Sequence, residues 1–107
     1  MRLTVFLMLE AAPSWLALSR AERDRIAGEA LGGLGVRLRH FDAEAFHARI
    51  SDVAMIEADD PADYYFAIER LRDSPLIASG HFRVAEIVPA YEDGFRQFEA
   101  AERSDAV

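Results

Sequence analysis

The segment Val36-Arg37-Leu38-Arg39-His40-Phe41 alternates in side-chain character, and this alternation decides the fold. Successive side chains of a strand point to opposite sides of a sheet, so the two aliphatic residues and His40 share one face. The two arginines and Phe41 share the other. A face that mixes charged and apolar side chains is not an ordinary interior, and a small sheet with helices on one side needs another cover for it. We expect a second copy of the chain to provide that cover.

Three further apolar runs and three helical segments surround this strand. The run Leu3 to Leu9 is almost wholly apolar, which is typical of a central strand that is buried on both faces. Ser19 and Glu22 have the spacing of a capping box, and Asp60-Pro61 is a strong helix start. The expected strands span residues 3–9, 36–41, 53–58 and 81–88, the last closed by Pro89. The expected helices span residues 20–31, the stretch from Pro61 to Ser74, and residues 91–102, where Tyr91, Phe95 and Phe98 form a stripe.

This order of elements predicts an α+β fold. Two strand-helix-strand units give the ferredoxin-like βαββαβ sandwich, with the first and third strands in the centre and here an additional C-terminal helix. The 107 residues, of which 51% are apolar, fit a single domain over residues 1–107. Two such chains with facing sheets would form a dimeric α+β barrel, so we expect a homodimer.

Composition argues against several classes of protein. The chain has no cysteine, which excludes disulfide scaffolds and thiolate metal sites and favours a cytoplasmic protein. A net charge of -7 without a basic stripe argues against nucleic acid and anionic membranes as partners. The apolar N-terminal stretch is short and runs into Pro13, so we expect no cleaved signal peptide. No run approaches the ~20 apolar residues of a membrane span.

Several segments resemble the darcynin family. They are Asp42–Phe46, Tyr64–Leu76 and Glu86–Glu99, and the similarity extends from Trp15–Leu18 over nearly the whole chain. That family is a domain of unknown function, so the resemblance implies one bacterial-type domain and supplies no catalytic residues. The layout is also similar to the dimeric α+β barrels, which include cofactor-free monooxygenases, isomerases and cyclases. That second likeness concerns the fold alone, and a fold does not decide function.

Three residues are candidates for proton transfer: His40, Glu57 and Glu86. His40 is expected near the helix-covered side of the sheet, where the alternative is a hydrogen-bonded structural histidine. Glu57 shares a strand face with Met55, and a register that sets it opposite Arg37 would give a cross-strand ion pair instead. Glu86 suits proton transfer if it is buried and is inert if it lies on an exposed edge.

Four residues are candidates for binding a ligand. Arg39 could hold a carboxylate beside Met55, because guanidinium groups match carboxylate geometry. Trp15 and Tyr65 could line a pocket mouth for an aromatic molecule, although aromatic residues at such positions are more often part of a core.

Metal and cofactor motifs are missing from the sequence. His40, His47 and His81 are spaced neither as a helical pair nor as an alternating strand pair, so we predict no metal site. The run Gly32-Gly33-Leu34-Gly35 follows a helix and lacks the lysine or serine of a phosphate-binding loop. We expect no cofactor.

Two functional hypotheses follow. The first is a domain that binds a small, largely apolar organic molecule between sheet and helices and transforms it without a cofactor, which requires a cavity of about 300 Å³ or more. The second is a non-catalytic interaction or regulatory module that uses the acidic surface and the aromatic terminal helix. The sequence alone does not decide whether the protein is an enzyme.

Overall fold

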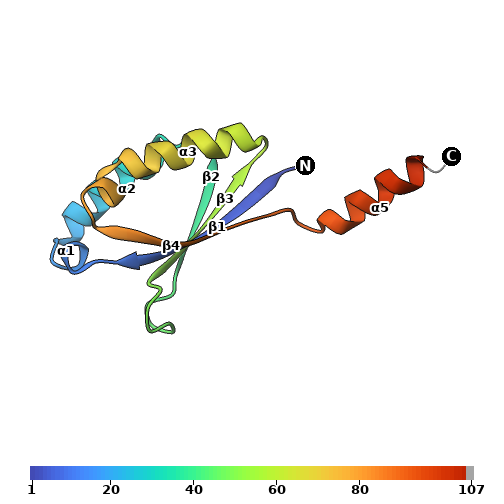
Figure 1. Ribbon diagram of the computed structural model, residues 1–107. Helices are drawn as coiled ribbons and strands as arrows, with labels where there is room; N and C mark the ends of the chain where they lie inside the picture. The colour runs from blue at the N-terminus through green and yellow to red at the C-terminus, as the bar shows by residue number, and fades with distance from the viewer. Residues whose placement is uncertain (106–107) are drawn as a thin grey trace.

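Residues 1–105 of the computed structural model are described, and they contain four strands and five helices. The strands are β1 (Leu3–Ala11), β2 (Arg37–Asp42), β3 (Asp52–Ala58) and β4 (Phe82–Ala90). The helices are α1 (Pro13–Leu16), α2 (Arg20–Gly32), α3 (Pro61–Asp73), α4 (Pro75–Ala78) and α5 (Gly94–Asp105). In Figure 1, α2 and α3 lie over one side of the sheet, and α5 projects away from it.

The strands form one antiparallel sheet in the order β2-β3-β1-β4. The first and third strands are therefore central, as the ferredoxin-like order of elements predicted. This order, with a helix after β1 and another after β3, confirms the predicted ferredoxin-like α+β fold.

The core lies between the sheet and the helices. Val5, Leu7 and Ile56 have no exposed surface, and burial along β3 alternates from Asp52 to Ala58. This alternation is expected when a strand has one covered face. The helices contribute one buried stripe each, made of Ile26 and Ala30 on α2 and of Ala67, Ile68 and Leu71 on α3.

Both main helices begin at the predicted caps. The Ser19 hydroxyl accepts a hydrogen bond from the Glu22 amide at 3.2 Å, and the Asp60 carboxylate accepts one from the Ala62 amide at 2.7 Å. Each bond satisfies a first-turn amide that has no partner within the helix. These local bonds explain why the helix starts could be predicted from the sequence.

Two predictions about the C-terminal part of the chain are corrected. Pro89 lies within β4 and does not end it; β4 is an edge strand, where the missing amide hydrogen of proline is tolerated. The last helix begins at Gly94 and not at Tyr91, after a turn in which Asp93 has a φ of 47°.

The second face of the sheet is covered by no helix within residues 1–105. Strand β1 is therefore fully buried on one face only, which corrects the prediction from its apolar run that both faces are buried. Phe6, Met8 and Met55 lie half-buried on this open face, and Phe41 is 44% exposed. Arg37 pairs in register with Glu57, and their side chains form an ion pair at 3.4 Å. The predicted cross-strand pairing is therefore confirmed.

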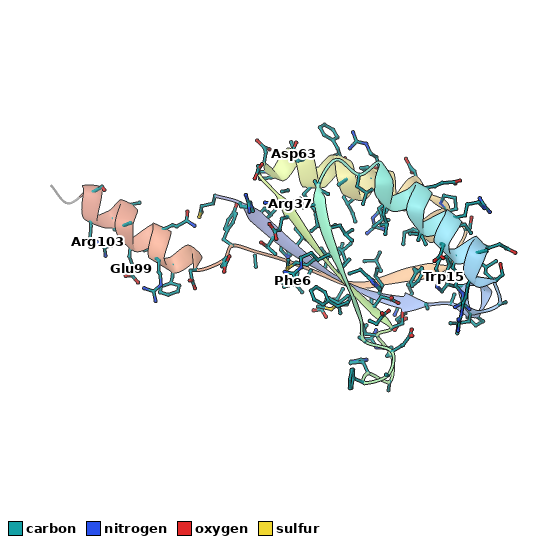
Figure 2. All side chains as sticks on the ribbon, turned by 180° about the vertical axis from the view of Figure 1, so that it is seen from behind. Phe6, Trp15, Arg37, Asp63, Glu99 and Arg103 are labelled. Carbon is teal, nitrogen blue, oxygen red and sulfur yellow. The ribbon has the colours of Figure 1, made fainter. Side chains whose placement is uncertain are left out.

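The aromatic stripe of α5 lies outside the core. Phe95 is 57% exposed and Phe98 is 64% exposed. Figure 2 shows Glu99 and Arg103 on the same helix, well away from the strands. Among the described residues, no helix combines the length and the apolar character needed to cross a lipid bilayer.

Candidate functional site

A cavity of about 530 Å³ lies between the sheet and the helices. Most of its wall is apolar and only half-buried, which indicates that the helices do not close completely over this end of the sheet. The side chains that line it come from every described element except α5; the main apolar ones are Leu9, Trp15, Ala27, Leu31, Leu38, Ala54, Leu71, Leu76, Ile77 and Phe82. A hollow of this size and character is typical of a site for a small organic molecule.

His40 and Asp52 form the polar part of the cavity wall. The His40 Nε2 atom lies 2.6 Å from Asp52 Oδ1 and 3.7 Å from Asp42 Oδ1. Because an ionised carboxylate only accepts hydrogen bonds, the short contact places a proton on Nε2 and leaves Nδ1 as an acceptor in the neutral ring. Asp52 thus orients the imidazole, as a carboxylate does for a histidine base.

The strand register explains this arrangement. His40 pairs with Ala54, and Asp42 pairs with Asp52, so all these side chains share the helix-covered face. Asp52 is 8% exposed, whereas His40 and Asp42 lie on the edge strand and reach solvent.

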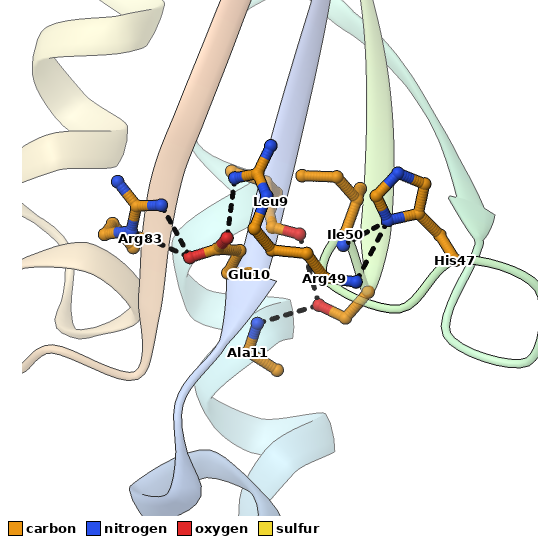
Figure 3. Close-up of polar contacts among 8 residues, drawn as sticks. Leu9, Glu10, Ala11, His47, Arg49, Ile50 and Arg83 are labelled. Carbon is orange, nitrogen blue, oxygen red and sulfur yellow. Dashed lines mark hydrogen bonds and ion pairs between the residues drawn. The ribbon is translucent and has the colours of Figure 1, made fainter.

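Hydrogen bonds to Leu9 and Ala11 (Figure 3) fix the residue before β3, and so the start of the strand at Asp52. The Ser51 hydroxyl accepts a bond from the Ala11 amide at 2.8 Å, and the Ser51 amide donates to the Leu9 carbonyl at 2.9 Å. The loop before Ser51 is closed by the Ala43 amide, which donates to the Ser51 carbonyl. Asp42 and Asp52 therefore lie at the two ends of a loop that is fixed by hydrogen bonds.

The solvent-facing rim of the cavity is acidic. Asp24, Asp42 and Glu44 are exposed lining residues, and Asp52 lies deeper. Arg23 also lines the cavity, but its guanidinium donates to the carbonyls of residues 15 and 16. This charge pattern favours a ligand whose polar end is cationic or a hydrogen-bond donor.

The other two histidines have structural contacts. His47 Nδ1 accepts hydrogen bonds from the amides of Arg49 and Ile50, at 3.0 and 2.7 Å (Figure 3). His81 Nδ1 lies 2.9 Å from the Ser14 hydroxyl, and its ring lies 5.8 Å from that of Trp15. Neither residue lines the cavity.

The structure places two of the residues proposed from the sequence at this cavity and three at another hollow. His40 and Trp15 line the cavity, where Trp15 also packs against Phe82 with ring centroids 4.9 Å apart. Arg39, Met55 and Glu57 line a different hollow of about 910 Å³ on the open face.

The last two proposed residues lie elsewhere. Glu86 is exposed on the edge strand β4, opposite Met8 on the open face, and this is the position in which we expected it to be inert. Tyr65 is 59% exposed on α3 and contacts Phe66 edge to face.

Sequence reasoning missed Asp42 and Asp52. Neither residue is among the candidate site residues named from the sequence. The spacing His40-Phe41-Asp42 places an imidazole and a carboxylate on one strand face, which is the signal that was available. Asp52 could be recognised as part of the site only from the register of β2 and β3, which sets it opposite Asp42.

Comparison with known proteins gives the family. The family model of darcynin, a domain of unknown function, matches residues 1–105. The chain belongs to the darcynin family. Among curated relatives, darcynin of Chromobacterium violaceum is 54% identical over 65 residues, covering 61% of this chain and 82% of the relative. Darcynin 1 of Acinetobacter baumannii is 36% identical over 90 residues, covering 79% of this chain and 100% of the relative.

Solved structures resemble this darcynin-family chain in fold. Chlorite dismutase from Candidatus Nitrospira defluvii, in complex with imidazole, superposes with a TM-score of 0.70 at 10% identity over 90% of this chain. An arginine-to-glutamate mutant of that enzyme gives 0.66 at 12% identity over 82% of this chain. The chain spans 46% and 38% of those two chains. Sequence identities this low show a shared fold and do not show that the chain has the activity of those enzymes.

Glu10 links the turn beside the site to the edge strand, and it gives a testable pH dependence. Its carboxylate lies 2.7 Å from both the Arg49 and the Arg83 guanidinium (Figure 3). The hydrogen bond from Arg49, followed by that from Arg83, lowers the pKa of Glu10 below its ordinary value of 4.5. The folded state therefore holds the charged form more strongly than the unfolded state does, which stabilises the fold at pH values above 4.5.

We expect Glu10→Gln to lower the free energy of unfolding near pH 7, and we expect this difference to shrink as the pH falls below 4.5 and through the folded-state pKa. Urea denaturation over a pH series measures it. Glu86→Gln is the control, because this exposed glutamate of the same face has no ion-pair partner among residues 1–105. A Glu10→Gln effect that stays constant over the acid range would contradict the assignment.

Proposed function

We propose that this domain binds a small, largely apolar organic molecule in the cavity between sheet and helices. The main observation that supports this proposal is the cavity of about 530 Å³, which has a largely apolar wall and is also lined by His40 and Asp52. The acidic rim indicates the chemical class of the ligand, which would be a molecule with an aromatic or aliphatic body and an amine or hydroxyl group at one end. A carboxylate-bearing ligand would meet the repulsion of several acids without a free arginine among the described lining residues.

The same geometry supports proton transfer without a cofactor. In the proposed reaction class, an isomerisation, cyclisation or oxygenation begins with removal of a proton from the bound molecule. His40 would accept that proton on Nδ1, and Asp52 would stabilise the imidazolium through Nε2. Trp15 would contribute an aromatic wall for the apolar body of the ligand.

A matched set of probes tests the binding proposal. 2-Phenylethylamine, 2-phenylethanol and 3-phenylpropanoate share a body and differ in the charge of the end group. We expect the amine and the alcohol to bind with a Kd of about 1 mM or tighter, which is reasonable for molecules of this size. The acid should bind about tenfold more weakly or not at all, because of the acidic rim. Isothermal titration calorimetry gives the three affinities.

A cavity-filling variant locates the binding. Ala27 lines the hollow from α2, so Ala27→Phe should abolish binding of the amine. Ala21→Phe is the matched control, because residue 21 is exposed on the same helix and does not line the cavity. The proposal fails if Ala27→Phe binds the amine like the wild type, if the acid binds best, or if neither the amine nor the alcohol binds.

We also propose that the open face is covered by a second copy of the chain, as in a dimeric α+β barrel. This face carries half-buried Phe6, Met8 and Met55 together with charges of both signs, which suits a self-complementary interface. The exposed aromatic side chains of α5 extend the apolar surface beyond the sheet. The homodimer would be a cytoplasmic single-domain protein.

The exposed aromatic residues also favour the second candidate function, a non-catalytic interaction module. In that case the open face and α5 would contact a different protein, and the chain alone would be a monomer. The association experiment described in the Discussion separates the two assemblies.

A further inference from the structure

We propose that His40, Asp42 and Asp52 form a site for a divalent first-row transition metal ion of the Zn²⁺ class. One imidazole nitrogen and two carboxylate oxygens from β2 and β3 lie within 4.8 Å of one another. A mixed nitrogen and oxygen ligand set favours such ions over Ca²⁺ and Mg²⁺, which prefer oxygen alone. The site was not predicted from the sequence because two of its ligands meet across a strand pair.

The charge balance of the sheet points to a cation. Asp42 and Asp52 are register partners on one face, and like charges directly opposite each other destabilise an antiparallel pair. Within residues 1–105, His40 is the one basic side chain within 4 Å of either carboxylate. A neutral imidazole leaves this strand pair with two uncompensated negative charges, one of them on a buried residue.

The neighbouring arginines do not compensate these charges. Arg49, in the loop that joins the two strands, pairs with Glu10 at 2.7 Å. Arg23, across the cavity, donates to backbone carbonyls at 3.1 and 2.7 Å. A bound divalent ion would balance the two carboxylates.

The ligand atoms lie within 4.8 Å of one another, so movements of the side chains could bring them to one ion. Ligand atoms that lie about 2.0–2.2 Å from a tetrahedral metal are roughly 3.3–3.6 Å apart. His40 Nε2 is 2.6 Å from Asp52 and 3.7 Å from Asp42, so these atoms bracket that range. The side chains of His40 and Asp42 are 46% and 73% exposed and can move, whereas Asp52 is held in the wall.

The ion would lie at the cavity, because all three ligands line it. Three protein ligands leave room for at least one more, which is the arrangement of metal sites that act on a bound molecule. With the ion bound, His40 Nε2 would carry no proton and the ring proton would lie on Nδ1, so the metal ligand and the His40 base of the proposed reaction are alternative states of one residue. Ion binding can be measured with the protein alone, without an organic ligand.

Titration of the full chain with ZnCl₂ by calorimetry, and with CoCl₂ by visible absorption, tests the site. We expect saturable binding of one ion per chain and, for Co²⁺, the absorption bands of a low-coordinate complex. Asp42→Asn should weaken Zn²⁺ binding about tenfold or more, because it removes one of three ligands. This exposed position is not needed for the core, so the variant should fold.

Glu44→Gln is the matched control. It makes the same charge change on an exposed acid that also lines the cavity but is not part of the cluster. We expect its Zn²⁺ affinity to stay within about twofold of the wild type, because only general attraction is lost. His40→Ala should lose the Co²⁺ bands.

Three results would overturn the metal site. They are no saturable Zn²⁺ binding to the wild type, equal losses for Asp42→Asn and Glu44→Gln, and unchanged Co²⁺ spectra for His40→Ala. Failure of the phenyl probes with retained Zn²⁺ binding would remove the proposed organic ligand and keep the metal site.

Discussion

Leu7→Ala is expected to lower the free energy of unfolding by about 2–5 kcal/mol, the largest effect on stability of any substitution considered. Leu7 lies on the central strand β1 and has no exposed surface. Its register partners are Ala54 on β3 and Ile87 on β4, and the short side chain of Ala54 cannot fill the hollow that the lost side chain leaves. Urea denaturation followed by circular dichroism measures the change.

Leu7→Met is the control for this prediction, because it keeps the volume and the apolar character of the side chain. We expect it to cost less than about 1.5 kcal/mol. A cost below about 1 kcal/mol for Leu7→Ala would mean that the site collapses around the smaller residue. The assignment of Leu7 to a rigid core would then be wrong.

Phe6→Asp is expected to weaken self-association about 100-fold or more. Phe6 directly precedes Leu7 on β1, and it pairs in register with Met55 on the open face. In the proposed symmetric dimer the variant places two unpaired charges in the interface, and an unpaired buried charge costs several kcal/mol. Sedimentation equilibrium over a concentration series measures the dissociation constant of the wild type and the variant.

Tyr65→Asp is the matched control for association. It puts the same charge on an exposed aromatic position of α3, on the helix side of the molecule. We expect the Tyr65→Asp chain to remain dimeric. A wild-type chain that is monomeric at about 100 μM would contradict the homodimer and favour a different protein partner for the open face.

The same experiment tests whether α5 packs against the second copy of the chain. Replacing Phe95 and Phe98 together with serine leaves the sheet untouched, because these side chains are exposed outside the core. If α5 packs on the second copy, this double variant should also associate more weakly. An unchanged dissociation constant would restrict the interface to the sheet.

Much of the fold was predictable because its signals are local. The apolar run of β1, the alternation of β2 and the caps Ser19 and Asp60 each act over a few neighbouring residues. The predicted ends were less accurate at Pro89, since an edge position is a property of the sheet and not of the segment.

The candidate site was predictable only in part. His40 was proposed because its strand face could be read from alternation, and Trp15 because it precedes the first long helix. Arg39 and Glu57 were proposed together with His40, yet the same alternation places them on the opposite face. Within one chain they cannot share a cavity with His40.

The sequence by itself determined the order of the four strands and three long helices, the two faces of β2, and the resemblance to the family; it did not predict the short helices α1 and α4. Tertiary structure alone decided which side chains meet. Asp52 reaches His40 because the register of β2 and β3 sets Asp42 opposite Asp52, and the hollow exists because the helices do not close over that end of the sheet. Register and layer packing depend on contacts between distant segments, whereas alternation and capping depend on neighbours along the chain.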